Sequence, residues 1–223
     1  MPLALRSLLL AGSTGLVGRA LLAQALAGPD LQAVHLLLRR AGAAPAADVR
    51  VRPLVVDFAA LPALPAADAA LCALGTTIKV AGSQAAFRAV DHDAVLAFAR
   101  AARDAGVSRF GLVSALGADA RSRVFYNRVK GEAEDAVRAL GSATLVIARP
   151  SLLLGDRQAL GQPPRRGERL GQHLAAPLAP LLPAAWRPIG ADAVARALLR
   201  ALAGAGAGVQ VLESARLHEL GAP

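Results

Sequence analysis

The sequence is poor in several residue types that usually carry chemistry. Its 223 residues include one cysteine, one tyrosine, one tryptophan and two lysines. Cys72 has no partner for an internal disulfide, so nothing points to an oxidising compartment. Because it lies in the apolar run 69–74, we expect a buried core thiol rather than a nucleophile. Aromatic residues make up 3% of the chain, too few for a platform on which nucleic-acid bases would stack.

Long apolar runs are also absent, which excludes a membrane-spanning helix. No run reaches the roughly 18 apolar residues that such a helix needs. Arg6, the apolar residues after it and Ala25-Leu26-Ala27 resemble a signal peptide with its cleavage site, but three glycines interrupt the apolar stretch. We therefore predict a soluble, cytoplasmic protein.

Positive charge exceeds negative charge along the chain. The net charge is +9 and the isoelectric point is near 11.3. A basic patch is what a nucleic-acid-binding protein needs, but here the charge comes mostly from arginines spread over the whole sequence, and no recognised binding motif occurs. We do not expect a nucleic-acid partner. Apolar residues make up 55% of the chain, which excludes disorder, and the length suits one α/β domain.

A glycine-spaced loop near the N-terminus organises the chain. Residues 3–10 predict a buried strand, and residues 16–26 have the apolar periodicity of a packed helix. Between them, glycines at 12, 15 and 18 open the backbone amides at the helix N-terminus to a pyrophosphate. The residues expected to seat it are Gly12, Ser13, Thr14, Gly15, Leu16, Val17 and Gly18. The spacing is G-x-x-G-x-x-G, so the loop taken alone is equally consistent with a plain tight turn.

Further strands and helices follow. We predict strands at 31–38, 51–56, 69–74, 107–113, 144–148 and 209–212, and helices at 83–105, 126–140, 191–202 and 215–220. This alternation indicates a doubly wound parallel sheet, a Rossmann fold, in which ligands bind at the carboxyl ends of the strands. No linker or repeat divides the chain, so we expect one domain over 1–223, with 151–190 forming a small substrate-side lid or lobe.

The second predicted strand ends at a pair of arginines, Arg39 and Arg40. In dinucleotide-binding folds an acid about 20 residues beyond the glycine loop binds the ribose 2′-hydroxyl of NAD. Two guanidinium groups stand there instead, and their permanently charged, paired donors suit the 2′-phosphate of NADP. The alternative is a solvated basic strand end. Asp57, after the third strand, either accepts a hydrogen bond from the adenine amino group or caps a turn.

The predicted helix 83–105 contains the triplet Asp91-His92-Asp93. Adjacent positions on a helix point about 100° apart, so these three side chains cannot converge on one metal ion. We predict a solvated helix face and no metal site.

The sole tyrosine, Tyr126, stands four residues before Lys130, one of the two lysines. On a helix this spacing places both side chains on one face, one turn apart. A phenol has an ordinary pKa of about 10, and a neighbouring ammonium group lowers it towards the working range of an acid–base catalyst. Ser114, at the end of the strand 107–113, is placed to donate a second hydrogen bond to a substrate carbonyl. The alternative is a core tyrosine beside a snorkelling lysine.

The glycine loop, the serine and the tyrosine–lysine pair, in this order, resemble the atypical short-chain dehydrogenase/reductase superfamily. More narrowly, the chain resembles the branch that contains the Tat-interacting-protein oxidoreductase. The stretches concerned are Leu74-Gly75-Thr76-Thr77, Val113-Ser114-x-x-Gly117-Ala118-Asp119, Tyr126-x-x-x-Lys130-Gly131-Glu132-x-Glu134 and Arg149-Pro150-x-x-Leu153-Leu154-x-Asp156-Arg157. The resemblance spans roughly residues 5–200.

This resemblance implies an oxidoreductase that prefers NADP(H) to NAD(H) and reduces a carbonyl, or oxidises an alcohol, of a small molecule. Ser114, Tyr126 and Lys130 would form the catalytic set, with Tyr126 donating the proton and Lys130 holding the nicotinamide ribose. Cofactor contacts beyond the glycine loop would come from Arg39, Arg40, Asp57, Phe58, Leu74, Gly75, Thr76, Thr77, Val113, Lys130, Arg149, Pro150 and Ser151. The chain would work as a monomer or homodimer.

A second class of function stays open. NmrA-like proteins, which share this fold, bind NADP without turning it over and act as redox-sensing regulators through protein contacts. They generally lack the tyrosine–lysine pair, so its presence here favours an enzyme.

The proline- and arginine-rich segment 155–190 predicts a lid over the substrate pocket. Its Arg165 and Arg166 would favour an anionic substrate. The alternative is a solvated surface segment.

Overall fold

The computed structural model describes residues 5–154, 183–204 and 206–222. Its centre is a seven-stranded sheet in the order β3-β2-β1-β4-β5-β6-β9, with every pair parallel. The strands are β1 (Ser7–Ala11), β2 (Ala33–Leu38), β3 (Val51–Val55), β4 (Ala69–Cys72), β5 (Arg109–Val113), β6 (Thr144–Arg149) and β9 (Gly208–Glu213). The chain winds outward from β1 in both directions, so the expected Rossmann fold is confirmed.

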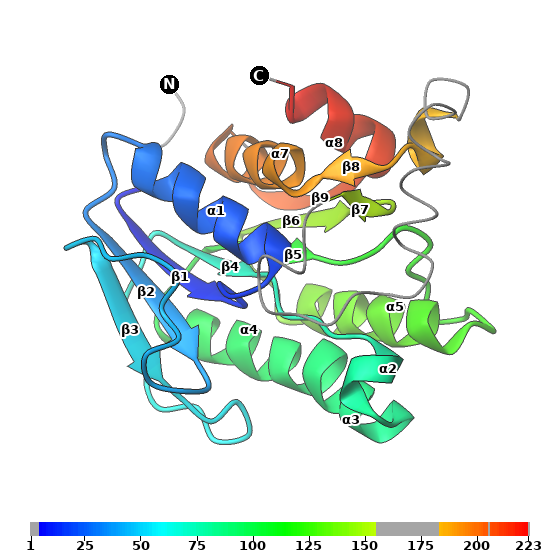
Figure 1. The fold of residues 1–223 in the computed structure, drawn as a ribbon, viewed down its shortest axis with the longest axis horizontal. Helices are drawn as coiled ribbons and strands as arrows, with labels where there is room; N and C mark the ends of the chain where they lie inside the picture. The colour runs from blue at the N-terminus through cyan, green and yellow to red at the C-terminus, as the bar shows by residue number, and fades with distance from the viewer. Residues whose placement is uncertain (1–4, 155–182, 205, 223) are drawn as a thin grey trace.

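Helices cover both faces of this sheet (Figure 1). One face carries α1 (Leu16–Ala27), α7 (Ala191–Gly204) and α8 (Ser214–Leu220), and the other carries α3 (Gln84–Arg88), α4 (Ala94–Asp104) and α5 (Phe125–Arg138). Successive strand residues point to opposite faces: Leu8 and Leu10 pack towards α1 and α7, whereas Leu9 and Ala11 pack towards α4. Both faces of the sheet are therefore apolar core, which is why its strands read as continuous hydrophobic runs.

The predicted helix 83–105 is interrupted. Between α3 and α4 the chain makes a π-helical turn, η1 (Ala89–Asp93), which inserts extra backbone into the helix and shifts the face that each later residue presents. The sequence also did not predict the short helix α2 (Ile78–Ala81), the 3₁₀ turn η3 (Ala184–Trp186) or the two-stranded sheet of β7 (Leu153–Leu154) and β8 (Ile189–Gly190).

The carboxyl ends of the central strands meet at one edge of the sheet. Ala11 of β1 is in register with Cys72 of β4, and Val113 of β5 with Ala148 of β6. The segments that follow these strands, including the glycine loop, Gly75 and Ser114, are thus brought together although they are far apart in the sequence. Open parallel sheets bind their ligands at this edge.

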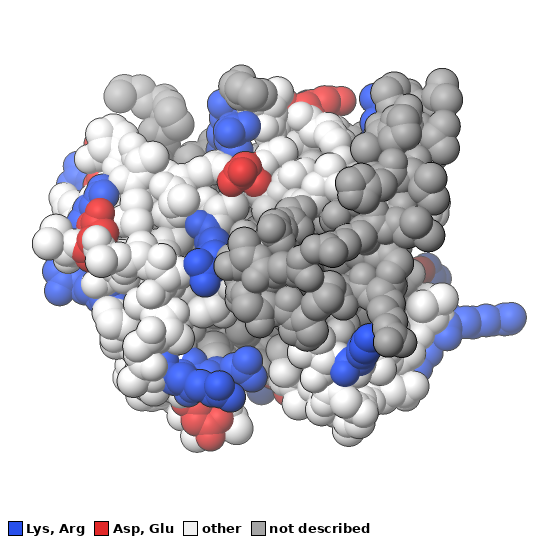
Figure 2. All heavy atoms as spheres, in the orientation of Figure 1, with Lys and Arg blue, Asp and Glu red and all other residues white. Residues whose placement is uncertain are grey.

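The structure also bears on the surface charge and on the expected absence of a membrane-spanning helix. Figure 2 shows Lys and Arg of the described residues in several separate groups on the visible face, some beside Asp or Glu. No helix in the described part of the chain is long and apolar enough to span a bilayer.

Residues 155–182, which include most of the expected lid and its arginines, lie outside the described residues, so the lid stays a prediction.

Candidate active site

The three glycines of the first loop have different structural roles. Gly12 has a φ of +86°, and a Cβ there would lie 2.4 Å from the carbonyl carbon of Ala73. A Cβ on Gly18 would lie 2.0 Å from the oxygen of Gly12. Among the described residues, a Cβ on Gly15 would meet only the Gly12 oxygen, at an ordinary 3.5 Å. The packing of the chain itself explains glycine at 12 and 18 but not at 15, where the missing side chain leaves room for a ligand.

The N-terminus of helix α1 has the properties of an anion-binding site. Gly15 is its N-cap, no side chain among the described residues caps it, and no acidic residue lies in its first turn. The free amides and the helix dipole favour a negative charge. Ser13 is 1% exposed, and its Oγ has no hydrogen-bond partner among the described residues. A buried hydroxyl without a partner is costly, so the loop fits the pyrophosphate of a dinucleotide.

Ser114 directly follows β5 at the same edge of the sheet. Its backbone N–H donates to the carbonyl oxygen of Ala148 at 2.8 Å, which fixes the residue between β5 and β6. Its side chain is buried, and Oγ has no hydrogen-bond partner in the described part of the chain. The hydroxyl is thus held in place and available to a ligand, as a group that polarises a carbonyl must be.

Helix α5 carries Tyr126 and Lys130 in its first two turns. The Tyr126 ring packs against the buried ring of Phe87, with centroids 5.5 Å apart. Lys130 is only 6% exposed. A Cβ on Gly75 would lie 3.6 Å from Lys130 Nζ, so the segment after β4 passes directly beside the ammonium group. The structure therefore brings the carboxyl end of β4 and the tyrosine–lysine pair together.

The buried ammonium group of Lys130 is stabilised by a carboxylate. Asp91 Oδ1 lies 2.8 Å from Lys130 Nζ, and Asp91 Oδ2 accepts a hydrogen bond from the backbone N–H of Thr76 at 2.8 Å. Burial alone lowers the pKa of an ammonium group, but Asp91 and the neighbouring Tyr126 oppose this and raise the pKa of Lys130 above its ordinary value. Lys130 is therefore positively charged at neutral pH.

The prediction that Asp91 lies on a solvated face is wrong. Asp91 is 1% exposed and lies in the π-helical turn η1, which faces α5. Phe87, Asp91 and Val95 follow one another at intervals of four residues, and all three are buried. This spacing between two apolar residues was the signal in the sequence that Asp91 is buried.

The residues expected at the adenosine end lie at the ends of two neighbouring strands. Leu38 of β2 is in register with Val55 of β3, and Arg39, Arg40 and Asp57 follow these strands and are exposed. Asp57 Oδ1 accepts a hydrogen bond from the backbone N–H of Ala59 at 2.9 Å, which is the turn cap weighed as its alternative role. The adenine contact stays a prediction.

Arg149, expected among the cofactor contacts, has its guanidinium group engaged elsewhere. It donates to both oxygens of Glu134, at 3.0 and 2.7 Å, and to Glu213 at 2.8 Å. These partners, the buried Glu134 above all, raise the pKa of Arg149 further above its ordinary value. The side chain ties α5 and β9 to β6, and a role of Arg149 in cofactor binding stays a prediction.

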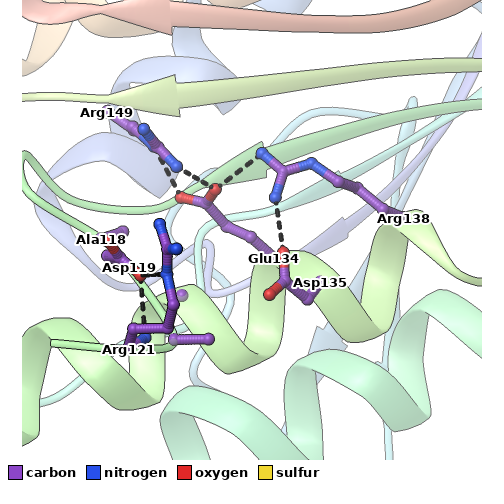
Figure 3. Close-up of a pocket in the computed structure, with 9 residues that line it drawn as sticks. Ala118, Asp119, Arg121, Glu134, Asp135, Arg138 and Arg149 are labelled. Carbon is purple, nitrogen blue, oxygen red and sulfur yellow. Dashed lines mark hydrogen bonds and ion pairs between the residues drawn. The ribbon is translucent and has the colours of Figure 1, made fainter.

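A pocket of about 440 Å³ surrounds this network (Figure 3). Its lining includes Asp119, Arg121, Glu134, Asp135, Arg138 and Arg149. Figure 3 shows the acidic and basic groups turned towards one another, and Arg138 pairs with both Glu134 and Asp135. Neither Ser114 nor Tyr126 nor Lys130 lines this pocket. We therefore interpret it as a structural charge network and place the candidate active site at Ser114, Tyr126 and Lys130.

Cys72, at the end of β4, is fully buried. Burial raises the pKa of its thiol to about 12. The thiolate, which is the nucleophilic form, is therefore scarce at neutral pH, and the expectation of a core thiol is confirmed.

Comparison with known proteins identifies the family. Residues 12–173 match the NAD(P)H-binding family. The chain belongs to this family. It is 35% identical over 225 aligned residues to the protein HTATIP2 of Rattus norvegicus, covering 97% of this chain and 89% of that protein. It is 36% identical over 159 residues to the protein "fmp52, mitochondrial" of Emericella nidulans, covering 67% of each. The resemblance to the Tat-interacting-protein branch is thus confirmed.

Solved structures share the fold of this chain. An oxidoreductase of the short-chain dehydrogenase/reductase family from Burkholderia thailandensis has a TM-score of 0.71 and 19% identity, covering 96% of this chain and 93% of that one. Membership of the family supports a nicotinamide cofactor, and the solved structure shows the shared fold. The cytoplasmic location stays a prediction, since relatives named fmp52 are called mitochondrial.

Proposed function

We propose that the protein is an NADP-dependent oxidoreductase that reduces a carbonyl group, or oxidises an alcohol, of a small molecule. The observation that carries this proposal is the buried, charged Lys130 one helical turn from Tyr126, beside Gly75 at the carboxyl end of β4. Membership of the NAD(P)H-binding family supports it.

In this proposal the chain holds the cofactor along the edge of the sheet. The amides at the start of α1 and the Ser13 hydroxyl bind the pyrophosphate, and Lys130 holds the nicotinamide ribose. When bound there, NADPH would supply the hydride for the reduction. Two observations support this placement: among the described residues the Ser13 hydroxyl has no hydrogen-bond partner, and a Cβ on Gly15 would make only an ordinary contact.

In the catalytic step, Ser114 and Tyr126 have different roles. Ser114 Oγ donates a hydrogen bond to the carbonyl oxygen of the substrate and polarises it, so that the carbon accepts the hydride. Tyr126 donates its phenolic proton to the same oxygen as general acid. In the reverse direction, the phenolate of Tyr126 accepts the proton of the alcohol.

Replacing Tyr126 by Phe tests the proposal, because it removes the phenolic oxygen and keeps the ring that packs on Phe87. We expect turnover of small aldehydes and ketones with NADPH to fall by at least about a hundredfold. NADPH affinity, measured by nicotinamide fluorescence, and the melting temperature should stay close to the wild-type values. Undiminished turnover would contradict the proposal. Tight NADPH binding by a wild type that turns over no carbonyl in the panel would favour a redox sensor instead.

We further propose that Arg39 and Arg40 make NADP(H) the preferred cofactor. They are exposed at the end of β2, next to the end of β3, where the 2′-phosphate of a bound NADP would lie. Replacing both by Ala should weaken NADPH binding by about tenfold to a hundredfold and leave NADH binding as it was. Arg100→Ala, at an exposed position on α4, is the control for the loss of positive charge. Equal losses for NADPH and NADH would contradict the assignment.

A further inference from the structure

We propose that the outer edge of β9 is a dimerisation surface, at which a second copy of this chain adds its own β9 in antiparallel orientation and continues the sheet. The proposal concerns the assembly of the protein and does not depend on its proposed activity. It starts from a difference between the two strands at the edges of the seven-stranded sheet, β3 and β9.

The edge at β3 is protected against pairing with another strand. The backbone N–H of Val56 donates to the carbonyl oxygen of Leu38 at 2.8 Å, so Val56 faces β2. Because successive residues of a strand direct their backbone groups to opposite sides, Pro53 faces away from β2. Proline has no N–H to offer there, and the neighbouring Arg52 is exposed and charged. Natural sheets keep their edges from pairing by such prolines and charges.

The edge at β9 lacks this protection. Residues 206–212 include no proline and no charged residue. Among the described residues, β9 pairs only with β6. Gly208, Val209 and Gln210 are exposed, so the helices that flank the sheet leave the first half of the strand uncovered. An exposed, unprotected strand edge is a template for another strand.

The backbone direction shows which groups of β9 are available to a partner. The N–H of Gly208 donates to the carbonyl oxygen of Ala143, just before β6, at 2.7 Å. Gly208 and, by alternation, Gln210 therefore direct their backbone groups towards β6. Val209 and Val211 direct theirs outward. The two valine side chains share one face of the sheet, and β-branched side chains pair well across neighbouring strands.

A second copy of the chain fits this edge because the segment is its own complement. Val209-Gln210-Val211 reads the same in both directions. When two copies pair about a two-fold axis at Gln210, Val209 of each strand lies opposite Val211 of the other, and the two residues exchange both N–H···O bonds. The two Gln210 side chains meet at the axis, where an amide both donates and accepts hydrogen bonds.

The charge of the chain also favours this edge for self-association. Each copy carries a net charge of +9, so two copies repel one another where their arginines meet. An edge without charged side chains avoids that repulsion, and it offers nothing to an acidic partner. Because two paired edge strands are smaller than a standard interface of about 1,600 Å², we expect a dimer that dissociates at micromolar concentrations.

Sedimentation velocity over a range of concentrations tests the dimer. Val209→Lys places a charge at an outward-facing position that is 54% exposed, so it should weaken dimerisation at least about tenfold without unfolding the chain. Val55→Lys is the matched control. Val55 is 59% exposed on the other edge strand, β3, and the substitution adds the same charge, so the dimer should be unaffected.

A cysteine at position 210 tests the register. Residues that face each other at a non-hydrogen-bonded position of an antiparallel pair have Cα atoms about 4.5 Å apart, close enough for a disulfide. The native Cys72 is fully buried, so it does not compete. Under mild oxidation we expect Gln210→Cys to form a covalent dimer rapidly. Val49→Cys, at a position that is 96% exposed and lies before β3, should form little.

A wild type that stays monomeric up to about 200 µM would overturn the inference. So would a dimer that persists unchanged in Val209→Lys, or one that Val55→Lys weakens instead, since either result places the interface elsewhere. If Val209→Lys does not fold, the cross-link decides: a dimeric Gln210→Cys protein that cross-links no faster than Val49→Cys would contradict the antiparallel pairing, and rapid cross-linking would support it.

Discussion

Single glycines of the first loop contribute differently to the fold, and we propose that one of them makes room for the cofactor. Gly12 and Gly18 let the strand, the loop and the helix approach one another, since a methyl group at either position would collide with backbone atoms. Among the described residues, a Cβ on Gly15 would make only an ordinary contact with the Gly12 oxygen, and Gly15 caps α1 without a side-chain hydrogen bond. The glycines in the sequence predicted the loop, but they did not reveal the different roles of the three positions. These roles depend on which backbone segment lies opposite each glycine.

The substitution Gly15→Ala separates an effect on stability from an effect on cofactor binding. An added methyl group has room in the protein, so the free energy of unfolding should fall by only about 0.5 kcal/mol, the cost of a poorer N-cap. The same methyl group would stand where a pyrophosphate approaches the amides, so NADPH affinity should fall at least about tenfold. Fluorescence titration and chemical denaturation measure the two effects.

Gly18→Ala is the matched control for this experiment. Its methyl group would overlap the Gly12 oxygen, so the cost in unfolding free energy should reach about 3 kcal/mol. A Gly15→Ala protein that bound NADPH as the wild type does would remove this loop from the proposed cofactor site.

At the level of elements, helix α5 carries both the proposed catalytic pair and part of a buried charge network. Its first two turns carry Tyr126 and Lys130, and its later turns carry Glu134, whose carboxylate has no exposed surface and pairs with Arg149 and Arg138. Arg149 also binds Glu213 at the end of β9. The helix is therefore anchored at its far end while its first turns present the tyrosine and lysine at the edge of the sheet.

Replacing Glu134 by Gln should cost about 2 kcal/mol of unfolding free energy. The change leaves the guanidinium group of Arg149 without its buried counter-charge; the cost is below that of a fully buried pair because Arg149 is 20% exposed. Denaturation by urea measures it. Asp135→Asn is the control, since Asp135 is 62% exposed, and its pair with Arg138 should contribute less than about 1 kcal/mol. Equal, small losses for the two variants would show that the network does not anchor α5.

The whole molecule places the site through its parallel topology. The central strands run in one direction, so loops from distant parts of the sequence emerge at the same edge. Apolar side chains on both faces of the sheet pack beneath the helices and make this edge a firm support. The seven strands were predicted within a few residues. The five inner strands are mostly buried and appear in the sequence as short apolar runs, whereas the edge strands β3 and β9 are largely exposed.

The sequence by itself determined the alternation of strands and helices, the glycine loop, and the spacing of Tyr126 and Lys130 on one helix face. These features depend on neighbouring residues and on the periods of local structure, so a linear pattern contains them. Only the tertiary structure decided that Asp91 is buried against Lys130 and that Glu134 and Glu213 hold Arg149. These contacts join residues far apart in the chain, so no local pattern in the sequence contains them.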